Sequence, residues 1–168
     1  GDNRTGTKLS NPGYWKNADW VGLTPFNESS TGGLVLSIVV SGGDVYAGGM
    51  RSLSFTLNTP GYWKNGVWIG LPVLNASCES FVACLMVVGS DVYAGGWSRT
   101  SPTLKKPGYW KNGTWVGLTP PDPSIPYEVT SLVVAGNDVY AGGSSIISAP
   151  GYWKNGTWVE LSPLGTDG

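Results

Sequence analysis

Apolar and polar residues alternate in two recurring patterns along the chain. In the first pattern, aromatic and aliphatic residues flank a polar pair, as in Tyr-Trp-Lys-Asn-Gly-Val-Trp-Ile-Gly-Leu at 62–71. Asn-Gly is the preferred pair for a two-residue type I′ turn, because both residues need positive φ. The pattern therefore predicts a β-hairpin in which Trp63 faces Trp68. The same register pairs a tryptophan across every other copy: Trp15 with Trp20, Trp110 with Trp115 and Trp153 with Trp158.

The second pattern is an almost continuous apolar strand that is followed by a short turn and another strand. Its last copy reads Ser-Leu-Val-Val-Ala-Gly at 131–136, a turn at Asn137, and Asp-Val-Tyr-Ala-Gly-Gly at 138–143. Continuous apolar runs of this length are typical of strands that are buried on both faces. Matching strands occur at 37–40 and 85–88, and no stretch shows sustained helical periodicity. We therefore predict a second, more buried hairpin in each repeat.

Together the two patterns form an internal repeat. Gly-Tyr-Trp-Lys-Asn occurs at 13–17, 61–65, 108–112 and 151–155, and Asp-Val-Tyr-Ala-Gly-Gly occurs at 44–49, 91–96 and 138–143. Four short strands repeated at this period are typical of β-propeller blades. We predict an all-β fold of β-propeller-type four-stranded antiparallel blades, in about three and a half repeats of ~47 residues. A β-trefoil closes with three repeats and would leave the fourth Tyr-Trp-Lys-Asn unit unused.

We expect residues 1–168 to form a single propeller-repeat domain with an incomplete set of blades. Complete blades are expected at about 34–71, 81–118 and 129–161, after an outer half-blade at 11–23. Because open sheet edges are normally closed or covered, three interpretations stay open: self-association, membership of a longer array, or a small ring with one defective blade. The chain starts with Gly1, so we also expect a processed product or a piece of a longer protein.

The composition excludes several classes of function. Nine Trp and 8 Tyr indicate a folded, tryptophan-rich chain, because disordered chains are poor in aromatic residues. A net charge of −1 without a Lys/Arg cluster argues against nucleic acid as a partner. No apolar run approaches the length needed for membrane insertion. Because the chain contains no His, Ser-His and Cys-His pairs and the usual zinc sites are excluded, and we expect no metal and no cofactor.

The acidic residues do not predict an enzyme. Asp44, Asp91 and Asp138 recur at the start of the same strand, where an aspartate normally bonds nearby backbone amides of a turn. Glycoside hydrolysis needs two carboxylates of different environment that face one cleft, and the glutamates occupy unrelated repeat positions. We therefore expect no catalytic residues.

The alternation of Tyr-Trp-Lys-Asn-Gly hairpins with Gly-x-Asp-Val-Tyr-Ala-Gly strands resembles a repeat of secreted or surface-exposed bacterial β-propeller proteins, most of which are uncharacterised. The resemblance covers about residues 11–161. It implies a propeller and an extracellular or cell-surface location, and it brings no catalytic residues. The long, dissimilar loops at 24–33, 72–80 and 119–128 depart from the regular repeat.

Aromatic residues offer an alternative function, because the apolar faces of sugars stack on indole rings. Six candidates follow: Trp15, Trp63, Trp97, Trp110, Tyr127 and Trp153. Four of them recur once per blade, whereas Trp97 and Tyr127 stand outside the repeated positions and are the better candidates for exposure. The competing interpretation is that the recurring tryptophans form the core between blades.

Modification sites and cysteines bear on the cellular compartment. Five Asn-x-Ser/Thr sequons begin at Asn3, Asn27, Asn75, Asn112 and Asn155, and a glycan on any of them implies an exposed loop in a secreted protein. In two of these sequons, at Asn112 and Asn155, the turn alone explains the Asn-Gly pair. Cys78 and Cys84 are close enough in sequence for a local disulfide, which would imply an oxidising compartment; two reduced, buried thiols are the alternative.

The leading hypothesis is a non-enzymatic, extracellular β-propeller-repeat protein with a structural role. It would self-assemble with copies of itself into an oligomer or fibre and would carry glycans. The first alternative is a lectin-like, carbohydrate-binding module with one aromatic site per blade, and the second is a propeller on which other proteins dock.

Overall fold

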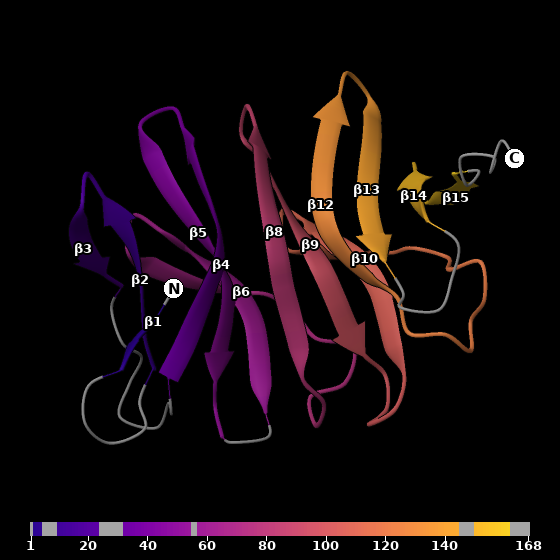
Figure 1. Cartoon of the computed structure of the whole chain (residues 1–168), viewed down its shortest axis with the longest axis horizontal. Coiled ribbons are helices and arrows are strands. Elements are labelled where there is room, and N and C mark those ends of the chain that lie inside the picture. The colour runs from indigo at the N-terminus through magenta and orange to yellow at the C-terminus, as the bar shows by residue number, and fades with distance from the viewer. Residues whose placement is uncertain (1, 5–9, 24–31, 55–56, 145–149, 162–168) are drawn as a thin grey trace, which may run out of the picture.

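The structure, a computed structural model, describes residues 2–4, 10–23, 32–54, 57–144 and 150–161 (Figure 1). Every regular element in these ranges is a β-strand, and no helix occurs within them. The all-β prediction is therefore confirmed, and the strands group into blade-like sheets.

Three four-stranded antiparallel, blade-like sheets follow a smaller half-sheet along the chain, and one parallel pair, Ser10 with Gly32, joins the half-sheet to the first of them. The half-sheet contains β1 (Asp2–Arg4), β2 (Ser10–Lys16) and β3 (Asp19–Gly22). The first sheet contains β4 (Gly32–Ser41), β5 (Asp44–Ser52), β6 (Asn58–Lys64) and β7 (Val67–Gly70). The second sheet contains β8 (Ser80–Val88), β9 (Asp91–Arg99), β10 (Lys105–Lys111) and β11 (Thr114–Gly117). The third sheet contains β12 (Glu128–Ala135), β13 (Asp138–Ser144), β14 (Gly151–Lys154) and β15 (Thr157–Glu160).

The outer hairpins, defined as β2–β3, β6–β7, β10–β11 and β14–β15, have the predicted register. Trp63 faces Trp68, and the other three tryptophan pairs form in the same way. Asn65 and Gly66 have φ of 49° and 83°, as a type I′ turn requires. The half-sheet keeps the same turn although Ala18 stands where the other copies have Gly, with a φ of 70° that is unfavourable for a side chain.

The inner hairpins, defined as β4–β5, β8–β9 and β12–β13, also turn over two residues. In the last of them, Ala135 pairs with Asp138, so that the turn consists of Gly136 and Asn137. Gly136 has a φ of 61° and therefore supplies the left-handed conformation that this turn needs. The two-hairpin organisation of each repeat is thus as the sequence predicts.

A β-bulge bends each inner hairpin at the same place. The register shifts between Val82 and Cys84 in the second sheet, and the first and third sheets shift at the equivalent positions. Gly96, the last residue of the repeated Asp-Val-Tyr-Ala-Gly-Gly motif, lies opposite the bulge. A β-carbon there would lie 1.9 Å from the carbonyl oxygen of Phe81, so only glycine fits without a backbone shift.

The sheets stack in chain order, with the half-sheet and the third sheet at opposite ends (Figure 1). The core consists of three clusters, one at each contact between consecutive sheets. At the contact of the first and second sheets, Trp110 packs with Tyr62 and Leu71 of the preceding sheet. Trp63 and Trp153 occupy the same position at the other two contacts. Trp63, Trp110 and Trp153 are therefore each covered by the sheet that precedes them.

Candidate functional site

A polar clasp joins the inner and outer hairpins of each complete sheet. In the first sheet, the Asp44 carboxylate accepts a hydrogen bond from the Asn65 amide (2.7 Å) and pairs with the Lys64 ammonium (2.9 Å). The Asn65 side-chain oxygen accepts the backbone N–H of Val45 at 2.9 Å, and Lys64 lies 5.3 Å from the ring centre of Tyr46. The second and third sheets repeat these contacts through Asp91, Lys111 and Asn112, and through Asp138, Lys154 and Asn155.

The clasp explains why the aspartate recurs. The sequence predicts a structural aspartate that bonds backbone amides of its own turn, whereas the structure shows the carboxylate bonded across to the neighbouring hairpin. The difference arises because Asn65 and its equivalents lie at the tip of an adjacent hairpin, which sequence separation conceals. Among the described residues, no group of three or more His, Cys, Asp or Glu side chains is arranged to hold a metal ion.

The clasp predicts a loss of stability in acid. Hydrogen bonds from Lys64 and Asn65 lower the pKa of Asp44, and Asn112 with Lys111 lowers the pKa of Asp91 in the same way. A carboxyl with a lowered folded-state pKa stabilises the fold above its ordinary pKa of 3.8, and this contribution disappears as the pH falls through the folded-state value. We expect the free energy of unfolding, measured in urea, to be level from about pH 5 to 7 and to fall below about pH 4. Asp91→Asn should flatten this acid limb, and an unchanged limb would contradict the assignment.

The recurring tryptophans do not form one sugar site per blade. Trp63, Trp110 and Trp153 are 0% exposed, so their rings have no free face on which a sugar could stack. Trp110 and Trp153 also donate their indole N–H to the carbonyl oxygens of Pro72 and Thr119, each at 2.8 Å. The interpretation of these residues as core between blades is therefore correct, and the lectin-like alternative loses its repeated sites.

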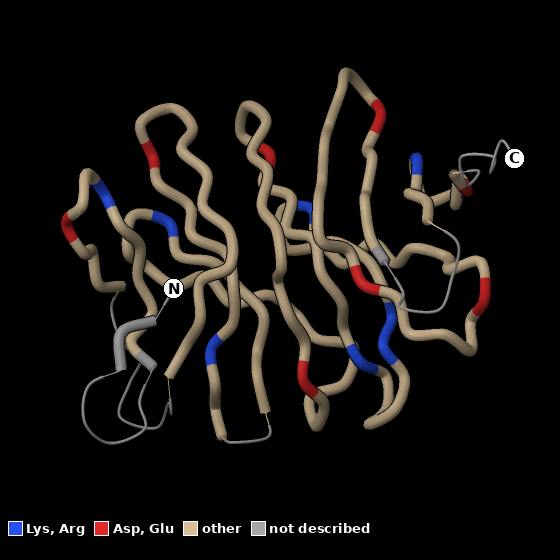
Figure 2. The backbone as a smooth tube through the Cα atoms, viewed as in Figure 1, with Lys and Arg blue, Asp and Glu red and all other residues tan. Residues whose placement is uncertain are grey.

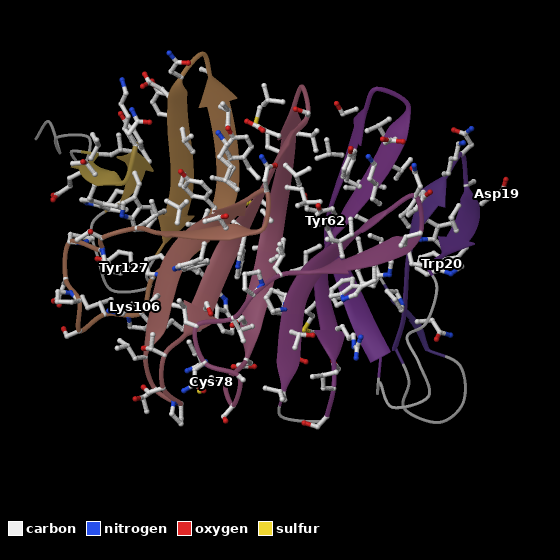
Figure 3. All side chains as sticks on the ribbon, turned by 180° about the vertical axis from the view of Figure 1, so that it is seen from behind. Asp19, Trp20, Tyr62, Cys78, Lys106 and Tyr127 are labelled. Atoms are coloured by element: carbon white, nitrogen blue, oxygen red, sulfur yellow. The ribbon has the colours of Figure 1, made fainter. Side chains whose placement is uncertain are left out.

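The two aromatic residues outside the repeat are buried as well, so the prediction of their exposure is wrong. Trp97 stacks on Phe81, its cross-strand neighbour, with ring centres 5.7 Å apart, and Lys105 lies 4.4 Å from its ring centre. Tyr127 packs edge-on against Trp153 and Trp158 (Figure 3). Both residues were expected to be exposed because they stand outside the repeated positions, but Trp97 is 7% and Tyr127 only 1% exposed.

Cys78 and Cys84 are both free and buried, so the structure does not contain the predicted disulfide. Cys78 lies in the loop before β8 (Figure 3), next to Glu79 and Arg99. Cys84 lies within β8 and belongs to the cluster between the second and third sheets. The extended backbone of β8 carries the second thiol away from the loop. Burial raises the pKa of Cys84 to about 12, which keeps this thiol protonated and unreactive.

The sequons have different structural settings. Asn75 donates its side-chain N–H to the carbonyl oxygen of Thr100 and caps the backbone N–H of Ser77. The amides of Asn112 and Asn155 belong to the polar clasps. The backbone of Asn3 lies in β1, and Asn27 lies outside the described residues. Glycosylation at these positions stays a prediction.

The two ends of the stack expose side chains that are buried at equivalent positions inside it. At the half-sheet end, Trp15 is 69% exposed, whereas its equivalent Trp63 is fully buried. At the other end, Leu161 is 49% exposed, whereas its equivalents Leu71 and Leu118 are 7% and 5% exposed. The ends of the stack therefore form the candidate functional site, and sequence analysis did not single out Leu161. The number of hairpins on either side of Leu161 could have indicated its exposure, because among the described residues only a sheet at an end of the stack has a neighbouring sheet on one side alone.

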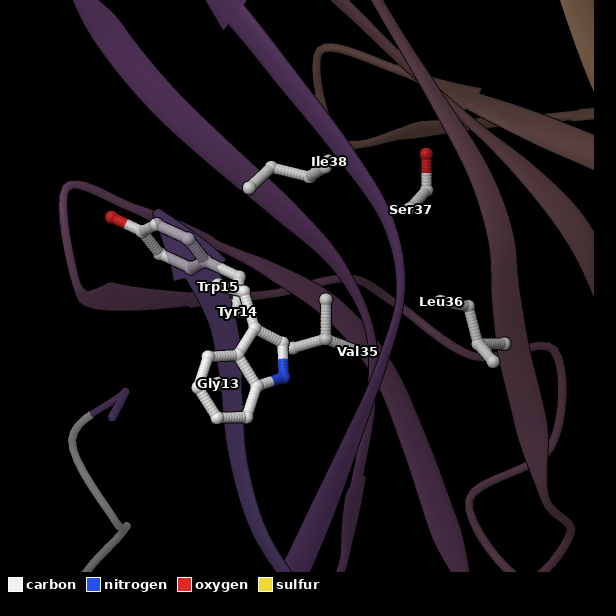
Figure 4. Close-up of a pocket in the computed structure, with 7 residues that line it drawn as sticks. All are labelled: Gly13, Tyr14, Trp15, Val35, Leu36, Ser37 and Ile38. Carbon is white, nitrogen blue, oxygen red and sulfur yellow. The ribbon is translucent and has the colours of Figure 1, made fainter. Parts of the chain in front are cut away.

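An open hollow of about 230 Å³ lies at the half-sheet end (Figure 4). It is lined by Gly13, Tyr14 and Trp15 of β2 and by 35–38 of β4. A second hollow, of about 190 Å³, is lined by the loop around Cys78 and by Arg99 and Pro102. In that hollow Arg99 pairs with Glu79 at 3.2 Å, so its charged groups satisfy each other.

Charges are spread along the whole stack (Figure 2). In the described part of the chain, no helix is long and apolar enough to cross a membrane. A comparison with models of known protein families finds no match for this chain, and a comparison with curated proteins finds no relative.

Proposed function

We propose that this chain is a non-enzymatic, structural β-propeller-repeat protein that assembles end to end with further copies of itself. The proposal is carried by one observation: the two ends of the stack expose opposite halves of the contact that consecutive sheets make inside it. The half-sheet end presents the tryptophan side of this contact through Trp15, and the third-sheet end presents the receiving side through Leu161.

The receiving side is composed of equivalent residues at every contact. Tyr46, Tyr62 and Leu71 of the first sheet receive Trp110 of the second. The third sheet has Tyr140, Tyr152 and Leu161 at the same positions, and the two tyrosine rings lie 6.1 Å apart, close to the 6.2 Å of the internal pair. The half-sheet, which carries Trp15, would therefore pack on the third-sheet face of another copy, where the receiving residues already have the internal arrangement.

A contact between two different faces is heterologous, so it either closes into a ring or continues into a filament. Both outcomes would cover the apolar side chains at the ends of the stack. We place this assembly outside the cell, as the resemblance to secreted repeat proteins and the sequons support. Glycans on the loops would then project from the sides of the assembly.

The experiment is sedimentation velocity over a wide range of protein concentration, combined with electron microscopy. We expect the mass to rise from 17.7 kDa with concentration. Leu161→Lys and Val133→Lys, both on the third-sheet face, should reduce this association, because each puts a charge into the contact.

A matched control uses an apolar side chain that is exposed away from both ends. Val67 is 67% exposed beside the turn of an outer hairpin, where other copies have Thr or Asp. Val67→Lys should leave association unchanged. A protein that stays at 17.7 kDa up to millimolar concentration would refute the proposal.

A further inference from the structure

We propose that the polar clasps shield the chain's three Asn-Gly pairs from deamidation, so that each clasp asparagine is a modification site that opens only when its inner and outer hairpins separate. Each pair forms the turn of an outer hairpin, at Asn65-Gly66, Asn112-Gly113 and Asn155-Gly156. The proposal concerns bonds within the complete sheets, so it does not depend on whether copies of the chain associate end to end.

Deamidation requires a close approach between an asparagine side chain and the residue that follows it. The backbone nitrogen of the following residue loses its proton and attacks the side-chain carbon Cγ, and the side-chain nitrogen departs as ammonia. The product is a cyclic imide, which water then opens to aspartate or isoaspartate. Glycine has no β-carbon to hinder the approach, and asparagine counts among the thermolabile residues. An Asn-Gly pair is therefore a susceptible site wherever its backbone is free to move.

The second sheet shows how a clasp prevents this approach. The backbone N–H of Asn112 donates to the carbonyl oxygen of Val92 at 2.9 Å, and the side-chain oxygen of Asn112 accepts the N–H of Val92 at 2.9 Å. The side-chain nitrogen of Asn112 donates to the Asp91 carboxylate at 2.8 Å. Both polar atoms on Cγ are thus held against β9, whereas Gly113 leads into β11. Attack on Cγ requires the side chain to rotate away from β9, which breaks both of its hydrogen bonds.

Asn65 and Asn155 are held in the same way. Their side-chain oxygens accept the N–H groups of Val45 and Val139 at 2.9 and 2.8 Å, and their side-chain nitrogens donate to the clasp aspartates, each at 2.7 Å. The backbone φ is 49° at Asn65 and Asn112 and 50° at Asn155. Every Asn-Gly pair of the chain is therefore bonded to a clasp.

Hydrogen bonding, and not burial, provides this protection. Asn65, Asn112 and Asn155 are all exposed, so water can reach each turn. A hydrogen bond to an ionised acceptor is about twice as strong as a neutral one, and the Lys111 ammonium holds the Asp91 carboxylate in place at 3.1 Å. The step that limits deamidation is therefore the release of the asparagine side chain from its aspartate.

Deamidation would also prevent the clasp from closing again. An ionised aspartate at position 112 could accept hydrogen bonds but donate none, so two carboxylates would meet where Asn112 donates to Asp91, and like charges this close repel each other. Isoaspartate would add a methylene group to the backbone of the turn. A sheet that has opened therefore keeps a chemical record of its opening.

The test follows deamidation of the full chain at mildly alkaline pH by mass spectrometry. Cleavage after lysine and arginine puts each Asn-Gly pair at the start of a different fragment, because a lysine precedes each pair. We expect each pair to react at least about tenfold more slowly in the folded chain than in the chain unfolded in guanidinium chloride. Asp91→Ala should accelerate the reaction at Asn112 about tenfold and leave Asn65 and Asn155 slow, since their clasps remain.

Two further variants make the result specific to the clasp. Asp138→Ala should reverse the roles, so that Asn155 becomes the fast site and Asn112 a slow one. Asp122→Ala removes an aspartate outside the clasps, whose hydrogen-bond partner is Ser124 of its own loop, and should leave all three rates unchanged.

Equal rates at Asn112 in Asp91→Ala and in the parent protein would overturn the proposal, as would equal rates in the folded and unfolded parent. A rise at all three sites in both Asp91→Ala and Asp138→Ala would overturn it as well, because the protection would then come from the fold as a whole. The product is tested by Asn112→Asp, which should unfold at a lower urea concentration than the parent at neutral pH. An unchanged midpoint would show that the clasp closes again after deamidation, contrary to the proposal.

Discussion

Replacing Trp110 by alanine will lower the free energy of unfolding by about 3–5 kcal/mol, whereas the same change at Trp15 will lower it by only about 1 kcal/mol. The two residues have the same place in the repeat and the same cross-strand partner, a tryptophan. They differ in burial, because Trp110 is 0% exposed and Trp15 is 69% exposed. The difference between the two substitutions therefore measures how much packing against the preceding sheet contributes to the free energy of unfolding.

The size of the effect follows from what Trp110 contacts. Its ring lies 4.5 Å from that of Trp115, it packs in the cluster with Tyr62 and Leu71, and its indole N–H donates to the carbonyl oxygen of Pro72. Alanine would remove all three contacts and leave a cavity that the stacked sheets cannot fill. Trp15 contacts Trp20 at 5.3 Å and faces solvent on its other side.

Urea unfolding followed by circular dichroism provides the measurement, with the transition of each variant fitted to its own folded and unfolded baselines. Similar losses of stability for Trp110→Ala and Trp15→Ala would mean that another surface covers Trp15 in solution. Repeating the measurement at low and high protein concentration distinguishes cover by a second copy from cover within the chain.

The hairpins were predictable from the sequence because their determinants are local. Asn65-Gly66 fixes the turn and the turn fixes the register, so Trp63 must face Trp68. The number of strands per repeat follows from the two alternating motifs. These are properties of neighbouring residues, and they do not depend on how the sheets pack.

Exposure was not predictable in the same way, because it depends on the neighbouring sheet. Trp15 and Trp63 share one motif and differ only in whether a sheet precedes them. Tyr127 precedes a strand in a loop, yet Trp153 and Trp158 enclose it. A motif therefore identifies the strand on which an aromatic residue lies, and only the count of hairpins on either side indicates whether it is covered.

The clasp shows the same limit for polar residues. Asp44 and Asn65 are 21 residues apart and form a 2.7 Å hydrogen bond. The sequence shows that both recur with the repeat, but it offers a local explanation for each of them separately. Their pairing becomes visible only when the inner and outer hairpins are placed side by side.

Gly96→Ala should lower the free energy of unfolding by about 3 kcal/mol, although it adds a single methyl group. The added β-carbon would lie 1.9 Å from the carbonyl oxygen of Phe81 and 3.2 Å from the α-carbon of Val82. Both atoms belong to the backbone of the bulge, so no side-chain rotation relieves the collision. The inner hairpin must then open, or the bulge must move along β8.

Gly142→Ala is the matched control, since it lies in the same motif of the third sheet. A β-carbon there meets only the Ser131 side chain and backbone, at 3.5 Å or more. We expect a change of less than about 0.5 kcal/mol, because ordinary contacts of this kind cost little. Equal effects of the two substitutions in urea unfolding would contradict the bulge as placed. The collision at Gly96 arises from the backbone, whereas at Gly142 no residue of a neighbouring sheet lies near the added β-carbon in the described part of the chain.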